Sequence, residues 1–199
     1  MDKIISLTSD RMLKVNNMII EKMKSEIPLI SDIASYILNS GGKRLRPILA
    51  LASAKLLNYE GSLNDIFLAS AIELIHTATL LHDDVVDDSK TRRGYKTANG
   101  LWGNQSTILV GDFLFSRAFE LMVETKSLDV LKTLSYASCK ISEGEIYQLI
   151  SQNNPQTSKK EYIKIITGKT SELFSAACKA GAIIATNDIK KIYALETYG

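Results

Sequence analysis

The chain has 199 residues, and 24 lysines and arginines against 22 aspartates and glutamates leave a formal net charge of only +2. This balance argues against a protein held to nucleic acid by bulk charge. Hydrophobic residues make up 45% of the chain, and only 3 prolines and 11 glycines interrupt it, which favours long helices over many short strands. We therefore expect an all-α protein whose length fits one domain or part of a larger one.

The first predicted elements follow from apolar periodicity and from helix-breaking residues. Apolar side chains recur at helical spacing over Ile4–Met23, which predicts an amphipathic helix or a pair of helices. Pro28 permits a new helix start before Leu29–Leu38, and Asn39-Ser40-Gly41-Gly42 provides its stop. The next helix is expected over Pro47–Leu57.

The middle of the chain is expected to hold one long helix, a polar loop and further helices. Ser62 with Asp65 predicts a capping box for a helix over Leu63 to about Asp88, and the glycine-containing stretch Lys90–Gly103 is interpreted as a loop. The remaining helices are expected at Asn104 or Gln105 to Val123, Ser127 to about Ile150, Lys159–Thr167, Thr170–Ala185 and Asp188–Gly199, with a loop at Ser151–Ser158.

Cysteine usage and hydropathy indicate the cellular setting. Cys139 and Cys178 lack metal-ligand spacing, and two cysteines are too few for a disulfide-rich scaffold. The first ten residues lack the features of a signal peptide. No apolar stretch reaches the roughly 18 to 20 residues that span a bilayer. We expect a cytoplasmic protein that does not span a membrane.

The long apolar helix is predicted to end in a stretch rich in aspartate, His82 to Asp88. Asp83 and Asp87 lie one turn apart on one helix face, and Asp84 lies about a quarter-turn away. Because the preceding helix is apolar and should be buried, the acids are expected at the mouth of a cavity, where they need a cation. Aspartate oxygens with room for water suit Mg²⁺. Taken alone, such a run is more often a solvated helix end.

Three cationic stretches accompany the acids. Lys43, Arg44 and Arg46 adjoin a helix start, where free N–H groups also attract anions. The pair Arg92-Arg93 follows the acids, and Lys169-Thr170 follows Gly168. Each stretch alone is more often ordinary surface charge, but together they are what a site for two diphosphates and their metal ions requires.

The sequence resembles the trans-isoprenyl diphosphate synthases, or polyprenyl synthetases, and especially the bacterial octaprenyl diphosphate synthases that make the quinone side chain. The likeness covers almost the whole chain and is carried by Gly41–Pro47, His76–Asp87, Arg92–Gly94, Gly111-Asp112, Glu143-Gly144-Glu145 and Lys169-Thr170. It implies an isoprenoid-synthase-type helical array around a central cavity.

The resemblance also implies a role for individual residues. The diphosphate of isopentenyl diphosphate would be held by Lys43, Arg46, His76 and Arg93. Mg²⁺ on the allylic diphosphate would be bound by Asp83 and Asp87, with Asp84 in support. The allylic diphosphate would also be contacted by Arg92. The allylic site near the developing cation would be lined by Lys169 and Thr170, with Gln148 close to the metals. His76, taken alone, is more commonly a satisfied core histidine.

The implied reaction is ionisation, condensation and elimination. The allylic C–O bond breaks, the alkene of isopentenyl diphosphate attacks the cation, and a proton is lost, so the protein would be a Mg²⁺-dependent prenyltransferase. Ala78 and Thr79 stand where bulky residues stop chain growth early in the family, so a long, membrane-associated product is expected.

The chain departs from the family in one respect. Full-length members carry a second aspartate-rich motif beyond the Lys-Thr pair, whereas the acids that follow Lys169 here form no cluster. We therefore expect residues 1–199 to be the N-terminal two-thirds of a single synthase domain without its C-terminal helices. Family members are homodimers, and a partner that supplies the remainder is an alternative.

Two other functions stay open at this point. The chain could be a non-catalytic diphosphate-binding subunit of a two-part synthase, or an inactive remnant of one. A terpene cyclase on the same scaffold is a further alternative, but cyclases generally lack a second diphosphate site such as Lys43 and Arg46.

Overall fold

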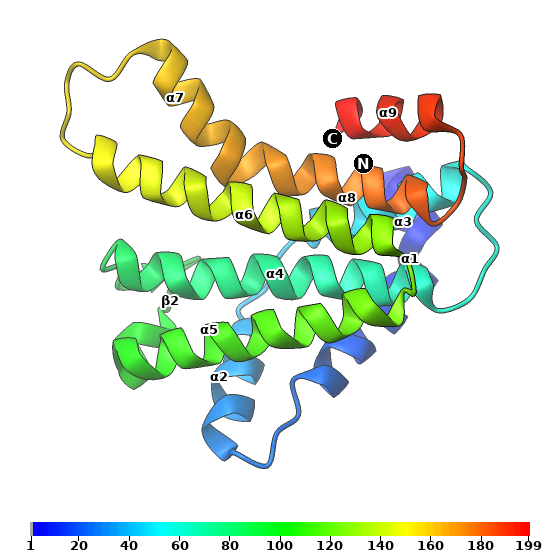
Figure 1. Ribbon diagram of the computed structural model, residues 1–199. Coiled ribbons are helices and arrows are strands. Elements are labelled where there is room, and N and C mark those ends of the chain that lie inside the picture. Colours follow the sequence, from blue (N-terminus) through cyan, green and yellow to red (C-terminus); the bar gives the residue numbers. More distant parts are fainter. Residues whose placement is uncertain (1) are drawn as a thin grey trace.

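The computed structural model describes residues 2–199, and these form an almost entirely helical molecule (Figure 1). In chain order the elements are α1 (Asp2–Lys22), α2 (Pro28–Asn39), α3 (Leu45–Leu56), α4 (Asn64–Val86), β1 (Thr91–Arg92), β2 (Tyr95–Lys96), α5 (Ala98–Glu124), α6 (Leu128–Ser151), α7 (Lys159–Ile166), the π-helical turn η1 (Thr167–Ser171), α8 (Glu172–Ile183) and α9 (Ile189–Tyr198). The expected all-α class is confirmed. No described helix combines the length and the apolar character needed to cross a membrane.

Helix α4 forms the centre of the molecule. It packs along α5 and also contacts α1, α3, α6 and α8 (Figure 1). Leu68, Ile72 and Ile75 on α4 are fully buried, which agrees with the nearly continuous apolar sequence of this helix. Each such side chain stabilises the fold by about 1.5 to 3 kcal/mol on burial. The polar residues at the C-terminal half of α4 are therefore held on a rigid support.

Helix α3 begins earlier than predicted. It starts at Leu45 rather than at Pro47, and Arg44 precedes it in a left-handed conformation with φ 49°. Pro47 lies in the first turn, where its missing N–H has no helical partner to lose. The early start brings Arg46 into the helix.

The predicted capping box at Ser62 and Asp65 is wrong. Ser62 Oγ accepts a hydrogen bond from the Asn64 amide at 3.3 Å, while the Asp65 carboxylate is bound by Arg11 of α1. Asp65 is buried, so an ion pair with Arg11 satisfies it better than an exposed cap.

The predicted loop Lys90–Gly103 is only partly a loop. Strands β1 and β2 form a short antiparallel hairpin, and α5 already begins at Ala98. Arg93 and Gly94 both have positive φ, as a tight hairpin turn requires. Gly103 has φ 81° and ψ 164°, which are not helical, so α5 consists of two helical segments that meet at a kink. The second segment begins at Asn104, as predicted.

The predicted break at Gly168 is a π-helical turn that joins α7 to α8 (Figure 1). Such turns are rare and frequently lie at functional sites. A Cβ on Gly144 of α6 would lie 2.8 Å from the Lys169 backbone nitrogen, so only glycine lets α6 approach the turn this closely. This contact brings Lys169 towards the acidic end of α4.

Candidate active site beside α4

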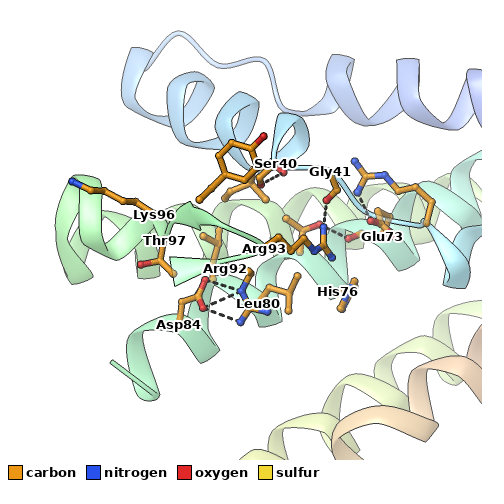
Figure 2. A pocket seen from close by; sticks show the side chains of 16 residues that line it. Ser40, Gly41, Glu73, His76, Leu80, Asp84, Arg92, Arg93, Lys96 and Thr97 are labelled. Atoms are coloured by element: carbon orange, nitrogen blue, oxygen red, sulfur yellow. Dashed lines mark hydrogen bonds and ion pairs between the residues drawn. The ribbon is translucent and has the colours of Figure 1, made fainter. Parts of the chain in front are cut away.

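Cationic side chains from three segments gather around one hollow beside the middle of α4. Its walls come from the loop after α2, the start of α3, the hairpin tip and α4. The hollow is lined by Ser40, Gly41, Gly42, Lys43, Arg44, Leu45, Arg46, Glu73, His76 and Arg93. A neighbouring pocket shares Arg44, Glu73, His76 and Arg93 and extends to Asp84 and Arg92 (Figure 2). The structure thus brings the predicted cations of residues 43, 46, 92 and 93 to one side of α4.

Arg46 is held by two neighbours. Its Nη1 lies 3.2 Å from Nε2 of His76, and its guanidinium carbon lies 4.3 Å from the ring centre of Phe174 on α8. The buried Nε of Arg46 has no hydrogen-bond partner among the described residues. A half-buried guanidinium with an unused donor suits an anionic ligand.

His76 differs from a cationic phosphate ligand. The pKa of His76 is lowered to about 3, chiefly by burial and also by the positive charges of Arg46, Arg93, Arg92 and Arg44. The imidazole is therefore neutral at physiological pH, and its Nε2 accepts a hydrogen bond from Arg46.

Arg93 ties the hairpin to the glycine loop. Its Nη1 donates to the Gly41 carbonyl oxygen (Figure 2). A Cβ on Gly42 would lie 3.0 Å from the same Nη1, so the loop passes directly against this guanidinium. Lys43 is exposed and forms no ion pair within the described part of the chain.

Arg92 and Asp84 are engaged with each other. Arg92 Nη2 lies 2.8 Å from Asp84 Oδ1, and Arg92 Nε lies 3.0 and 3.1 Å from the two carboxylate oxygens (Figure 2). Only 6% of the Asp84 side chain is exposed. The predicted roles of Asp84 at a metal and of Arg92 at a diphosphate stay predictions, because this bidentate pair must open, or act as a unit, to fulfil them.

An acidic centre lies at the C-terminal end of α4. Lys169 of η1 has its Nζ 2.8 Å from Glu145 Oε2 on α6 and 3.8 Å from Asp83 Oδ2. Asp87 caps the C-terminus of α4 one turn beyond Asp83. Thr170 is exposed beside Lys169. Gln148, one turn beyond Glu145, is half-buried, and its predicted place near a metal stays a prediction.

Negative charge is in excess at this centre. The pKa of Asp83 is raised to about 6, chiefly by burial and also by Glu145 and Asp87, while Lys169 and Arg92 only partly oppose them. Hard carboxylate oxygens without enough countercharge fit a divalent cation such as Mg²⁺. Among residues 2–199, however, no three acidic, histidine or cysteine side chains converge as a closed metal site. Asp83 and Asp87 could therefore supply only part of the ligands of such an ion, and the predicted metal site stays a prediction.

The raised pKa of Asp83 predicts that the ionised carboxylate, the form a metal ion would need, lowers the free energy of unfolding. The folded protein holds the Asp83 proton more tightly than the unfolded chain does, so this contribution to stability is complete below about pH 4 and is lost as pH rises through about 6. In EDTA at pH 7, Asp83→Asn should raise the free energy of unfolding by on the order of 1 kcal/mol, after allowance for partial exposure.

Urea unfolding at pH 7 and pH 4 tests this expectation. The advantage of Asp83→Asn should shrink towards pH 4, whereas Asp88→Asn, at an exposed acid of the same segment, should show no such pH dependence. An equal advantage of Asp83→Asn at both pH values would contradict it.

The two residues predicted to permit a long product have different environments. Ala78 is fully buried in the core, and Thr79 is half-buried and donates its hydroxyl to the His76 carbonyl at 2.8 Å. Their influence on product length stays a prediction.

Three residues of the site were missing from the sequence prediction. Glu145 stands in a stretch that carried the family likeness, so a signal was present. Glu73 lies one turn before His76 on α4, where helical spacing could have revealed it. Nothing in the sequence pointed to Phe174, because its contact with Arg46 joins two helices far apart in the chain.

Comparison with known proteins places the chain in a family. The polyprenyl synthetase model matches residues 27–199. The chain belongs to the polyprenyl synthetase family. It is 44% identical over 198 residues to octaprenyl diphosphate synthase of Haemophilus influenzae and 43% identical over 199 residues to that of Escherichia coli. All of this chain is covered, but only 60% and 61% of those relatives.

Solved structures of polyprenyl synthetases agree with this assignment. A decaprenyl diphosphate synthase from Rhodobacter capsulatus superposes with a TM-score of 0.96 at 46% identity, over 99% of this chain and 61% of that one. A polyprenyl synthase from Caulobacter crescentus, complexed with calcium and isoprenyl diphosphate, gives 0.95 at 46% identity, over 99% and 60%. The resemblance and the fold expected from it are thus confirmed, and the chain spans about 60% of the length of these relatives.

Proposed function

We propose that this chain is a prenyltransferase that adds isopentenyl diphosphate head-to-tail to an allylic diphosphate. The product would be a long-chain all-trans polyprenyl diphosphate, a precursor of a quinone side chain, made in the cytoplasm. One observation carries the proposal: the cationic hollow and the acidic centre follow one another along one side of α4. His76 and Asp83 are seven residues apart, or about 10 Å along the helix, which leaves room for two substrates side by side.

The cationic hollow would bind isopentenyl diphosphate. Arg46 offers a half-buried guanidinium whose Nε has no partner among the described residues, and neutral His76 orients it through the hydrogen bond at Nε2. Arg93 and exposed Lys43 would add charge from the two flanking loops. Arginine forks match diphosphate oxygens in pairs, so this set favours a diphosphate over a single carboxylate.

The acidic centre would receive the allylic diphosphate together with Mg²⁺. Asp83 and Asp87 would hold the ion, with Asp84 in support, and bound Mg²⁺ would stabilise the charge that develops on the leaving diphosphate. Lys169 and Thr170 border this centre, and Arg92 adds positive charge beside it. These side chains orient the diphosphate and balance its charge before the reaction begins.

The chain's own residues bind and orient during the reaction and form no covalent bond. The allylic C–O bond breaks, the alkene of isopentenyl diphosphate forms the new C–C bond, and a proton passes to the departing diphosphate. Leu80 and Leu81 lie on α4 between His76 and Asp83, and they would help to exclude water from the intermediate cation. Ala78 and Thr79 would leave depth for a long chain.

We propose further that residues 1–199 act as the N-terminal part of one synthase domain, as a homodimer or with a partner that completes it. A relative from Bacillus subtilis, 33% identical over 180 residues, is named heptaprenyl diphosphate synthase component 2. Because that relative is named as one component of an enzyme, a second candidate function is diphosphate binding without catalysis, as a subunit of a two-part synthase.

Incubation with labelled isopentenyl diphosphate, an allylic primer and Mg²⁺ tests the proposal. Butanol-extractable label that requires primer and disappears with EDTA is the expected result, and chromatography of the dephosphorylated product gives its length. If no label is extracted at high protein concentration, although calorimetry shows pyrophosphate binding, the non-catalytic candidate replaces the proposed activity.

A further inference from the structure

A buried glutamate lies at the centre of the cationic hollow. Glu73 is only 4% exposed, and its carboxylate is bound by Nη1 of Arg44. It belongs to α4, one turn before His76, and it lines both pockets of the site (Figure 2). A buried carboxylate inside a site that attracts anions opposes ligand charge, so its presence there calls for a physical reason.

The surroundings of Glu73 provide that reason. Arg44, Arg46 and Arg93 converge here from the residue before α3, from α3 itself and from the hairpin tip, and all three act on the Glu73 carboxylate. The pKa of Glu73 is raised, because burial outweighs the opposing effect of these guanidinium groups. The direct contact with Arg44 holds the carboxylate in place. Without a carboxylate, three guanidinium groups would repel one another and move apart.

The backbone conformation of Arg44 shows that this residue fixes where α3 begins. This residue has φ 49° at the start of α3, a conformation that non-glycine residues adopt rarely, and the ion pair with Glu73 holds its side chain on α4. The start of α3 then places Arg46 two residues later, against His76 and Phe174. Glu73 therefore connects the rigid centre of the fold to the loop that carries Lys43 and Arg46.

We propose that Glu73 is a positioning residue, which fixes the start of α3 through Arg44 so that Arg46, Arg93 and Lys43 present a preformed site to a diphosphate. This inference rests on the proposed diphosphate site, but it does not require that the chain be catalytically active. It predicts that the carboxylate helps an anion to bind despite its own negative charge.

Glu73→Gln separates positioning from simple charge balance, because the two give opposite signs. If Glu73 acted only as a nearby negative charge, its removal would strengthen pyrophosphate binding. If it positions the arginines, Glu73→Gln should weaken that binding at least about tenfold, the factor that corresponds to about 1.4 kcal/mol. Titration calorimetry with inorganic pyrophosphate on the full chain measures the affinity without any turnover.

Asp65→Asn is the matched control. Asp65 is a second buried acid on α4, paired with Arg11 in the same way, but it lies at the far end of the helix. Both variants should lose thermal stability, and only Glu73→Gln should lose pyrophosphate affinity. Glu73→Asp, which keeps the charge and favours folding, should give a smaller loss of affinity.

Four outcomes would overturn the inference. The first is an unchanged or tighter pyrophosphate affinity in Glu73→Gln, and the second is an equal loss of affinity in Asp65→Asn. If Glu73→Gln does not fold, the third is an unchanged affinity in Glu73→Asp. The fourth is that the unmodified chain does not bind pyrophosphate. If that chain binds pyrophosphate but elongates no primer, the proposed activity fails while the role of Glu73 is still decided by the variants.

Discussion

Asp83→Asn should abolish Mg²⁺-dependent binding of a non-reactive allylic diphosphate analogue, with an affinity loss of about 100-fold or more. Asp83 is the carboxylate that faces Glu145 and Lys169, and its pKa is raised first by burial and then by the neighbouring carboxylates of Glu145 and Asp87. Asparagine preserves the size of the side chain but removes the charge that a hard cation requires. About 100-fold corresponds to about 2.7 kcal/mol, a reasonable loss for one of two carboxylate ligands.

The matched control for this variant is Asp88→Asn. The Asp88 side chain is 76% exposed and pairs only with Lys90, so its replacement should leave analogue binding unchanged. Titrations with and without EDTA separate the metal-dependent part of the affinity. Retention of Mg²⁺-dependent binding by Asp83→Asn would refute the assigned role, and an equal loss in Asp88→Asn would point to a general charge effect. Loss of binding together with a gain in stability at pH 7 is the combination that an electrostatically strained site predicts.

Arg46→Met should weaken the binding of isopentenyl diphosphate about 100-fold and raise its KM correspondingly. Methionine retains an apolar side chain against Phe174, so packing is largely preserved while the guanidinium is lost. The lost group is a half-buried, charged donor beside His76, and charge-assisted bonds of this kind are the strong ones. The affinity of the allylic analogue should change much less, because Arg46 belongs to the cationic hollow.

Arg117→Met provides the same substitution outside the site. Arg117 lies 5.0 Å from the ring centre of Phe113, pairs with Glu120, and also has a buried Nε without a partner in the described residues. Calorimetry with isopentenyl diphosphate should show no change in this variant. Equal losses in both variants, or a loss in Arg46→Met that also affects the allylic analogue to the same extent, would contradict the assignment of Arg46 to one substrate.

Helical periodicity was sufficient for most of the fold. The predictions for α1, α2, α6 and α9 are confirmed to within a few residues, because each has a clear apolar face or a terminal signal. Asp188, where the last helix was predicted to begin, accepts hydrogen bonds from the amides of Lys190 and Lys191. The hairpin was missed, because two-residue strands carry no periodicity and are held by distant contacts such as Arg92 with Asp84 and Arg93 with Gly41.

The candidate site was also predicted only in part from the sequence. The spacing of Asp83, Asp87 and His76 on one helix follows from 3.6 residues per turn, and the family likeness indicated the cations that accompany them. Asp84 was expected beside Asp83 at a metal, but it lies against Arg92. The rotation of about 100° between successive helix residues, which separates Asp84 from Asp83, can be inferred from the sequence. The residue that contacts Asp84 from another element cannot.

Sequence alone therefore determined the all-α class, most helix positions and the family, and it indicated the cations and aspartates of the candidate site but not Glu73 or Glu145. Tertiary structure decided which of these charges meet: Glu73 with Arg44, Asp84 with Arg92, and Glu145 with Lys169. The physical reason is that periodicity encodes contacts within a helix, over three or four residues. Ion pairs between helices depend instead on how closely two backbones approach, as at Gly144 and the π-helical turn, and no local pattern records that distance.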